Sequence, residues 1–276
     1  MNYLPAAVVI LCVTLSPAAE PKPPASAKER LETIKKDIAD AEAAFRAAWA
    51  KLPDPSKDDP GVEKLYQVFL KKQNEGFSTV LDMARADPKS DVGFAALEWL
   101  LTIPRTFYLP AGKEAMELAT RHHAANARIG KIIAWVGYFP PHFTKNEEAA
   151  RALIKAVAEQ NPDRTARGQA VMAIAWEAKT QFASAEYQRK PDVDRLAAEA
   201  EKRFEAVLKD YADCPRLIRD NAGTLGDIAR SELFALRFLR IGKSAPNIDA
   251  EDLDGVKFKL SDYRGKVVVL DFWGDW

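Results

Sequence analysis

Helical apolar spacing interrupted by prolines dominates the first 240 residues of the chain. Between residues 31 and 52, apolar residues recur alternately three and four positions apart: Leu31, Ile34, Ile38, Ala41, Phe45, Ala48 and Leu52. This spacing places one apolar stripe on a single helix face. Ser26 and Glu29, three positions apart, have the spacing of a capping box at its start. The pattern predicts a long first helix that begins after Ser26.

Comparable stretches follow, separated by prolines and polar turns. They lie at 62–81, 88–101, 112–124, 127–137, 147–159, 164–183, 192–211 and 224–239. We see no convincing β pattern before residue 245. The sequence therefore predicts a mainly α protein with an all-α domain over residues 26–240.

Two arrangements of these helices fit the sequence. Asp87-Pro88 leads into GFAALEWLL, and Asn161-Pro162 leads into GQAVMAIAW, which is a faint internal similarity. Stacked helical hairpins in the style of a tetratricopeptide array would explain it. The irregular period fits an irregular helical bundle equally well. Stacked hairpins would offer a concave face to a peptide or protein partner, which the sequence does not identify.

The N-terminal residues resemble a targeting segment. Residues 6–15 are uninterruptedly apolar, and small residues follow at 16–19. A run of about ten residues is too short to span a bilayer but fits the core of a secretory signal peptide. We predict a signal peptide over 1–19, a Pro-rich linker over 20–25, and export to the periplasm or cell envelope. No Lys or Arg precedes the run, so an uncleaved anchor or a misassigned start stays open.

Charge and residue usage exclude several classes of function. The chain carries 40 Lys+Arg and 40 Asp+Glu, which argues against a nucleic-acid-binding protein. Two cysteines, Cys12 in the leader and Cys214, exclude a multi-cysteine zinc or iron–sulfur site. His122 and His123 are adjacent, so on a helix they point about 100° apart and cannot share one metal ion. We expect no metal, no bound cofactor, and a buried thiol at Cys214.

The composition changes at Ile241. Asp254-Gly255 is a strong turn signal, and the alternation that follows it predicts a half-buried strand over 256–260. Residues 267–270 are a continuous Val-Val-Val-Leu run, which is typical of an interior strand of a parallel sheet. These features predict the beginning of an α/β domain over 241–276.

The motifs of this segment resemble the opening of a thioredoxin-like domain. Gly-Lys-x-Ala-Pro, Asp-Gly and Leu-Ser-Asp-Tyr-Arg-Gly-Lys-Val-Val-Val-Leu-Asp-Phe-Trp occur in that order over about 35 residues. More narrowly, they are similar to the redoxin and TlpA-like thiol–disulfide reductases of the AhpC/TSA superfamily. The matching positions are Gly242, Lys243, Ala245, Pro246, Asp254, Gly255, Leu260 to Trp273, and Trp276. An exported helical region ahead of such a domain resembles planctomycete-type multidomain members.

The resemblance implies thiol chemistry just beyond the printed residues. In the family, a Cys-x-x-Cys at a helix N-terminus follows the tryptophan, and the first thiolate attacks a protein disulfide. The sequence ends at Trp276, so we expect a truncated, redox-inert chain. In the family, Asp271 would match a buried proton acceptor, and Phe272, Trp273 and Trp276 would flank the active-site turn. Expected partners are a protein disulfide substrate and a thiol reductant.

Two further functions stay open at this point. The chain could be a non-catalytic helical binding module, with no chemistry in either part. It could also be the beginning of a peroxiredoxin-type antioxidant enzyme, which reduces peroxide with a single peroxidatic cysteine. The aromatic ending over 272–276 favours the reductase type.

Overall fold

The computed structural model describes residues 26–52, 59–139, 145–218 and 223–271. The predicted signal peptide, the Pro-rich linker and Cys12 lie outside these ranges. Within them the protein is mainly α, as predicted. The α-helices are α1 Ala27–Trp49, α2 Pro60–Ala86, α3 Asp91–Leu101, α4 Pro110–His123, α5 Gly130–Tyr138, α6 Glu147–Gln160, α7 Arg164–Tyr187, α8 Val193–Tyr211 and α9 Leu225–Phe238. None of these described helices is long and apolar enough to cross a membrane.

Local capping fixes where the first helices begin. The backbone N–H of Glu29 donates to Ser26 Oγ, and the Ser26 N–H donates to the Glu29 carboxylate at 2.7 Å. This reciprocal pair confirms the predicted capping box. At the start of α2, the Asp59 carboxylate accepts from two backbone N–H groups, and Pro60 occupies the first turn. Proline is tolerated there because its missing N–H has no partner within the helix.

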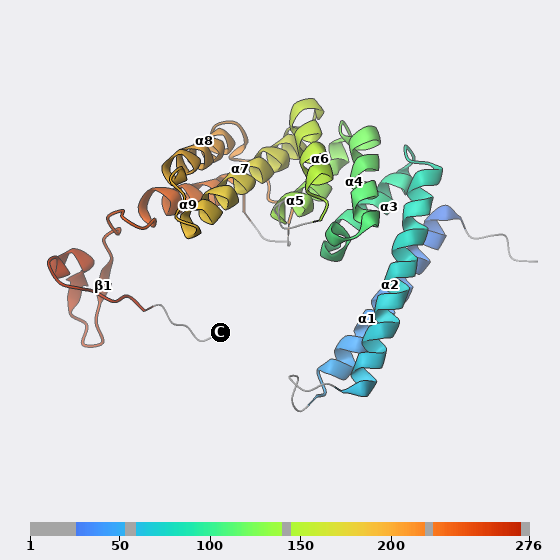
Figure 1. Cartoon of the computed structure of the whole chain (residues 1–276), viewed down its shortest axis with the longest axis horizontal. Helices are drawn as coiled ribbons and strands as arrows, with labels where there is room; N and C mark the ends of the chain where they lie inside the picture. The colour runs from blue at the N-terminus through green and yellow to red at the C-terminus, as the bar shows by residue number, and fades with distance from the viewer. Residues whose placement is uncertain (1–25, 53–58, 140–144, 219–222, 272–276) are drawn as a thin grey trace, which may run out of the picture.

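Most helices that follow one another in sequence lie side by side, but α4 packs against α3 and α6, and α5 packs mainly against α7. α1 and α2 form a hairpin that projects from one end, and α3 to α9 continue as an elongated arc (Figure 1). The 3-10 helices Pro104–Tyr108 and Ala127–Ile129 connect α3 to α4 and α4 to α5. This order is compatible with stacked hairpins. The internal repeat itself stays a prediction.

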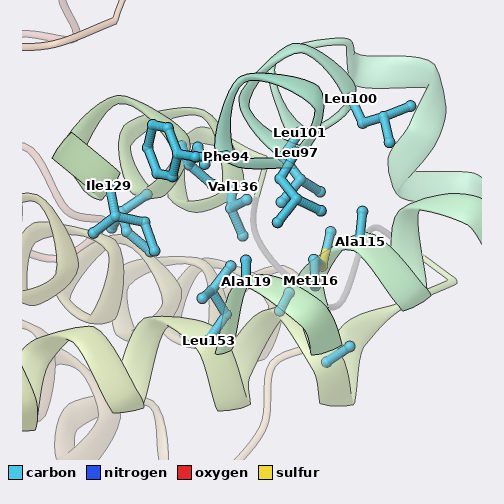
Figure 2. Packing of buried hydrophobic residues seen from close by; sticks show 14 of the residues in the cluster. Phe94, Leu97, Leu100, Leu101, Ala115, Met116, Ala119, Ile129, Val136 and Leu153 are labelled. Atoms are coloured by element: carbon cyan, nitrogen blue, oxygen red, sulfur yellow. The ribbon is translucent and has the colours of Figure 1, made fainter. Parts of the chain in front are cut away.

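Two hydrophobic clusters hold the arc together. The first is built mainly from α2 to α6, and Figure 2 shows Phe94, Leu97, Met116 and Leu153 pointing into it. The second joins α7, α8 and α9 around Phe204 and neighbouring buried residues. α7 supplies small alanines to the first cluster and Met172, Ala175 and Phe182 to the second. This helix therefore couples the two halves of the array.

The C-terminal part is a small antiparallel hairpin set apart from the helices (Figure 1). β1 Asp249–Glu251 pairs with β2 Lys257–Lys259, with Ala250 opposite Phe258. Gly255 has φ +78° in the connecting turn, a conformation that favours glycine, so the predicted turn is confirmed. A 3-10 helix, Leu260–Tyr263, follows β2 directly.

The predicted strand over residues 267–270 is not formed in the structure. Val267 is 98% exposed and Val269 is 89% exposed, and the segment has no strand assignment. Among the described residues the only strands are β1 and β2, which pair with each other. Among these residues no neighbouring strand pairs with the valine run, and its side chains are left exposed instead of being covered by helices. An interior parallel strand requires both neighbouring strands and covering helices.

Candidate functional site

Asp271 ends the described part of the C-terminal segment. It is exposed and follows the unpaired valine run. The sheet that would bury a proton acceptor at this position is absent from the described residues, so the role of Asp271 stays a prediction. Phe272, Trp273 and Trp276 lie outside the described residues. Whether these four predicted site residues lie together therefore stays a prediction.

Cys214 is the one cysteine among the described residues, and it is buried at the end of α8. Its Sγ lies 3.6 Å from Nη1 of Arg164, which also makes a bidentate ion pair with Asp213. Burial raises the pKa of the Cys214 thiol, and this effect exceeds the opposing effect of the Arg164 charge. The prediction of a buried thiol at Cys214 is confirmed. A protonated, enclosed thiol is a poor nucleophile.

His123 is buried at the end of α4 and tied to the fold. Its Nε2 lies 2.6 Å from the Pro88 carbonyl oxygen, and its ring meets Phe94 edge-on with centroids 5.1 Å apart. Burial lowers the pKa of His123, and the charges of His122 and Arg128 lower it further. In the described part of the chain, no group of three or more His, Cys, Asp or Glu side chains could hold a metal ion.

A concave surface feature lies between α5, α7 and α9. It is an open pocket of about 630 Å³ whose lining includes Tyr138, Trp176, Arg216 and Ile228. The rings of Tyr138 and Trp176 meet edge to face at 6.1 Å. Lys179 of α7 and Glu232 of α9 also line the pocket and form an ion pair with each other.

Sequence reasoning missed this pocket. Trp176 is only partly buried and lines the pocket. Arg216 comes from the irregular segment after α8, 40 positions beyond Trp176. No local pattern connects two such residues. Only the packing of α7 against α8 and α9 brings them together.

A short stretch of the chain is related to thiol–disulfide oxidoreductases. The thioredoxin-like motifs of the C-terminal segment indicate the same class of protein. The similar proteins are the thiol-disulfide oxidoreductases ResA. That of Bacillus anthracis is 53% identical over 38 residues, which are 14% of this chain and 22% of the relative. That of Bacillus subtilis (strain 168) is 51% identical over 35 residues, 13% of this chain and 20% of the relative.

The extent of this similarity is limited. The chain spans about a fifth of the length of the curated relatives it matches. No protein-family model matches the chain. No solved structure matches it.

Proposed function

We propose that the chain belongs to an exported thiol–disulfide oxidoreductase of the redoxin or TlpA-like type. In this proposal residues 26–240 form an all-α domain, and a thioredoxin-like domain begins at residue 241. The observation that carries it is the 53% identity to ResA over 38 residues. That length is close to the 36 residues of 241–276, where the thioredoxin-like motifs lie.

The proposed chemistry is disulfide exchange by a paired dithiol. The first thiolate attacks one sulfur of a substrate disulfide and releases the other as a thiolate, forming a mixed disulfide. The second thiol then attacks this bond, which releases the reduced substrate and leaves the pair oxidised. A thiol reductant returns two electrons to the pair. The proposed substrate is therefore a protein disulfide, and the proposed reductant is a partner that carries thiols.

The printed sequence holds cysteines only at positions 12 and 214. They are far apart in sequence, and the second is buried. We propose that the 276-residue chain is itself redox-inert, and that Cys-x-x-Cys lies beyond Trp276. In the completed domain, Asp271 would accept a proton from the resolving thiol. Phe272, Trp273 and Trp276 would pack beside the active-site turn.

Insulin reduction with dithiothreitol tests the proposal. The 276-residue chain is compared with a chain extended by the codons that follow Trp276 in the source DNA. The extended chain should reduce insulin well above background, and the 276-residue chain should not. A variant of the extended chain with both new cysteines changed to serine is the control. Activity of the short chain, or downstream codons without paired cysteines, would contradict the proposal.

Export is tested separately from the thiol chemistry. Expression with residues 1–25 intact should give a mature protein that begins after Ala18 or Ala19, as measured by mass spectrometry of the cell-envelope fraction. Recovery of the uncleaved chain in the cytoplasm would count against export and leave the enzymatic proposal untouched.

A further inference from the structure

Arg216 is the one charged residue of the pocket between α5, α7 and α9 without an ionic partner among the described residues. Lys179 pairs with Glu232. Asp227 pairs with Arg230, with 2.6 Å between Nη2 and Oδ1. Arg216 makes no ion pair with the described residues, and its buried Nε has no hydrogen-bond partner. Among the described residues, the pocket therefore presents one positive charge that no carboxylate pairs with.

The chemistry around Arg216 specifies what could bind there. A guanidinium presents a planar fork of donors that matches the two oxygens of a carboxylate. Next to it, Trp176, Ala183 and Ile228 supply apolar lining. A volume of about 630 Å³ is sufficient for one large side chain with its carboxylate. The matching ligand group is a carboxylate joined to a large apolar group.

The apolar surface continues along α9 beyond the pocket. Ser231 lines the pocket, and Phe234 and Phe238 follow it three and seven positions later, on the same helix face. Phe234 is 46% exposed and Phe238 is 47% exposed, with ring centroids 5.2 Å apart. From Ser231 to Phe238 the helix rises about 10 Å, which is the length of about three extended residues. This strip favours an extended ligand over a small molecule.

We propose that the pocket binds the C-terminal carboxylate of a polypeptide whose last residue is large and apolar. The carboxylate pairs with Arg216, and the last side chain packs beside Trp176. The preceding residues run along the strip of Phe234 and Phe238. This peptide site goes beyond the proposed thiol chemistry and does not depend on it.

Calorimetric titration of the 276-residue chain tests the site. The probe is the synthetic peptide acetyl-Ala-Leu-Gly-Phe, used as the free acid and as the C-terminal amide. The acid should bind saturably with one site per chain, and the amide should bind at least about tenfold more weakly, since it lacks the charge. Equal affinities, or no saturable binding of the acid, would overturn the proposal.

Substitutions test whether Arg216 causes the preference for the free acid over the amide. Arg216→Gln should remove the difference between acid and amide, and Arg216→Lys should retain part of it because the charge stays while the fork is lost. Arg203→Gln is the matched control, since Arg203 is exposed on α8 and pairs with Glu199. Circular dichroism establishes that each variant is folded. An unchanged preference in folded Arg216→Gln would refute the assignment.

A second arm separates a peptide from a small acid. Phe234→Ser with Phe238→Ser should weaken binding of the peptide several-fold and leave binding of 3-phenylpropionate unchanged. 3-Phenylpropionate should itself bind more weakly than the peptide, since it cannot reach the strip. If it bound as tightly as the peptide, the ligand would be a small organic acid, and the peptide assignment would be wrong.

Discussion

The imidazole of His123 is hydrogen-bonded to the carbonyl oxygen of Pro88, with 2.6 Å between Nε2 and O. The contact joins the end of α4 to the turn that precedes α3. Since Nε2 meets a carbonyl, that nitrogen carries the proton in the neutral ring. On the other side of the ring, Nδ1 lies 3.4 Å from the Asn126 side-chain amide. A second proton at Nδ1 would turn this nitrogen from a hydrogen-bond acceptor into a donor, and this donor would face the Asn126 amide.

His123 makes the stability of the helical array fall in mild acid. Burial lowers its pKa in the folded chain below the ordinary value of 6.5. The unfolded chain therefore binds more protons as pH falls below about 6.5, and the free energy of unfolding decreases until the folded pKa is passed. Above about pH 7 this contribution is fully present. Urea denaturation between pH 5 and pH 8 measures it.

The neighbouring histidine provides the control. His123→Gln should flatten the pH dependence in this window, while His122→Gln should leave most of it in place. An unchanged slope in His123→Gln would show that other groups cause the acid sensitivity.

Asn161 joins two turns through its buried side chain. Its Nδ2 donates to the carbonyl oxygens of Ala124 and Asn126 at 2.7 and 2.9 Å, and its Oδ1 accepts from the Asp163 N–H. Asn161→Ala leaves these backbone groups without a partner, so we expect a loss of about 2–3 kcal/mol of stability. Urea titration should show a lower midpoint with an unchanged m-value. Asn74→Ala, on the exposed face of α2, should change the free energy of unfolding by less than about 0.5 kcal/mol.

Close approach of α5 and α7 depends on Gly137. A Cβ at this position would lie 2.3 Å from the Ala173 Cβ. Gly137→Ala gains about 1 kcal/mol in helix propensity, but the forced separation of the helices costs about 1–3 kcal/mol, and we expect net destabilisation. Ala173→Gly in the same chain should recover part of the loss in thermal unfolding. No recovery would place the strain elsewhere.

The sequence predicts the helices well because their signals are local. The Ser26–Glu29 box, the apolar stripe of α1 and the Pro-containing breaks act within a few residues of the element that they define. α7 ends at Tyr187, four positions after the predicted end at 183, and Arg189 then takes a positive φ of 53°. The extra turn adds the buried Ala185 to the end of α7. The end is capped locally, since the backbone N–H groups of Arg189 and Lys190 donate to the carbonyl oxygens of Glu186 and Ala185 at 3.0 and 2.9 Å.

Features that depend on distant residues were harder to predict. The valine run over 267–270 has the composition of an interior strand, but composition cannot supply the neighbouring strands that such a segment requires. The pocket of Trp176 and Arg216 is likewise created by helices that meet only after folding. In both cases the missing information is the identity of the packing partner, which a local pattern does not contain.

Burial should protect Cys214 from thiol reagents in the native protein. Its side chain is only 2% exposed and its pKa is raised by burial, so few molecules carry an accessible thiolate at pH 8. In a Cys12→Ser background, reaction with Ellman's reagent should be slow, limited by opening of the α8–α9 region, and should become fast in urea. A variant with Cys214→Ser and Ser78→Cys places one thiol on the exposed face of α2 and should react at once. Equally fast reaction of native Cys214 would mean that the end of α8 opens readily, which would contradict the packing of Cys214 among the buried residues of the second cluster.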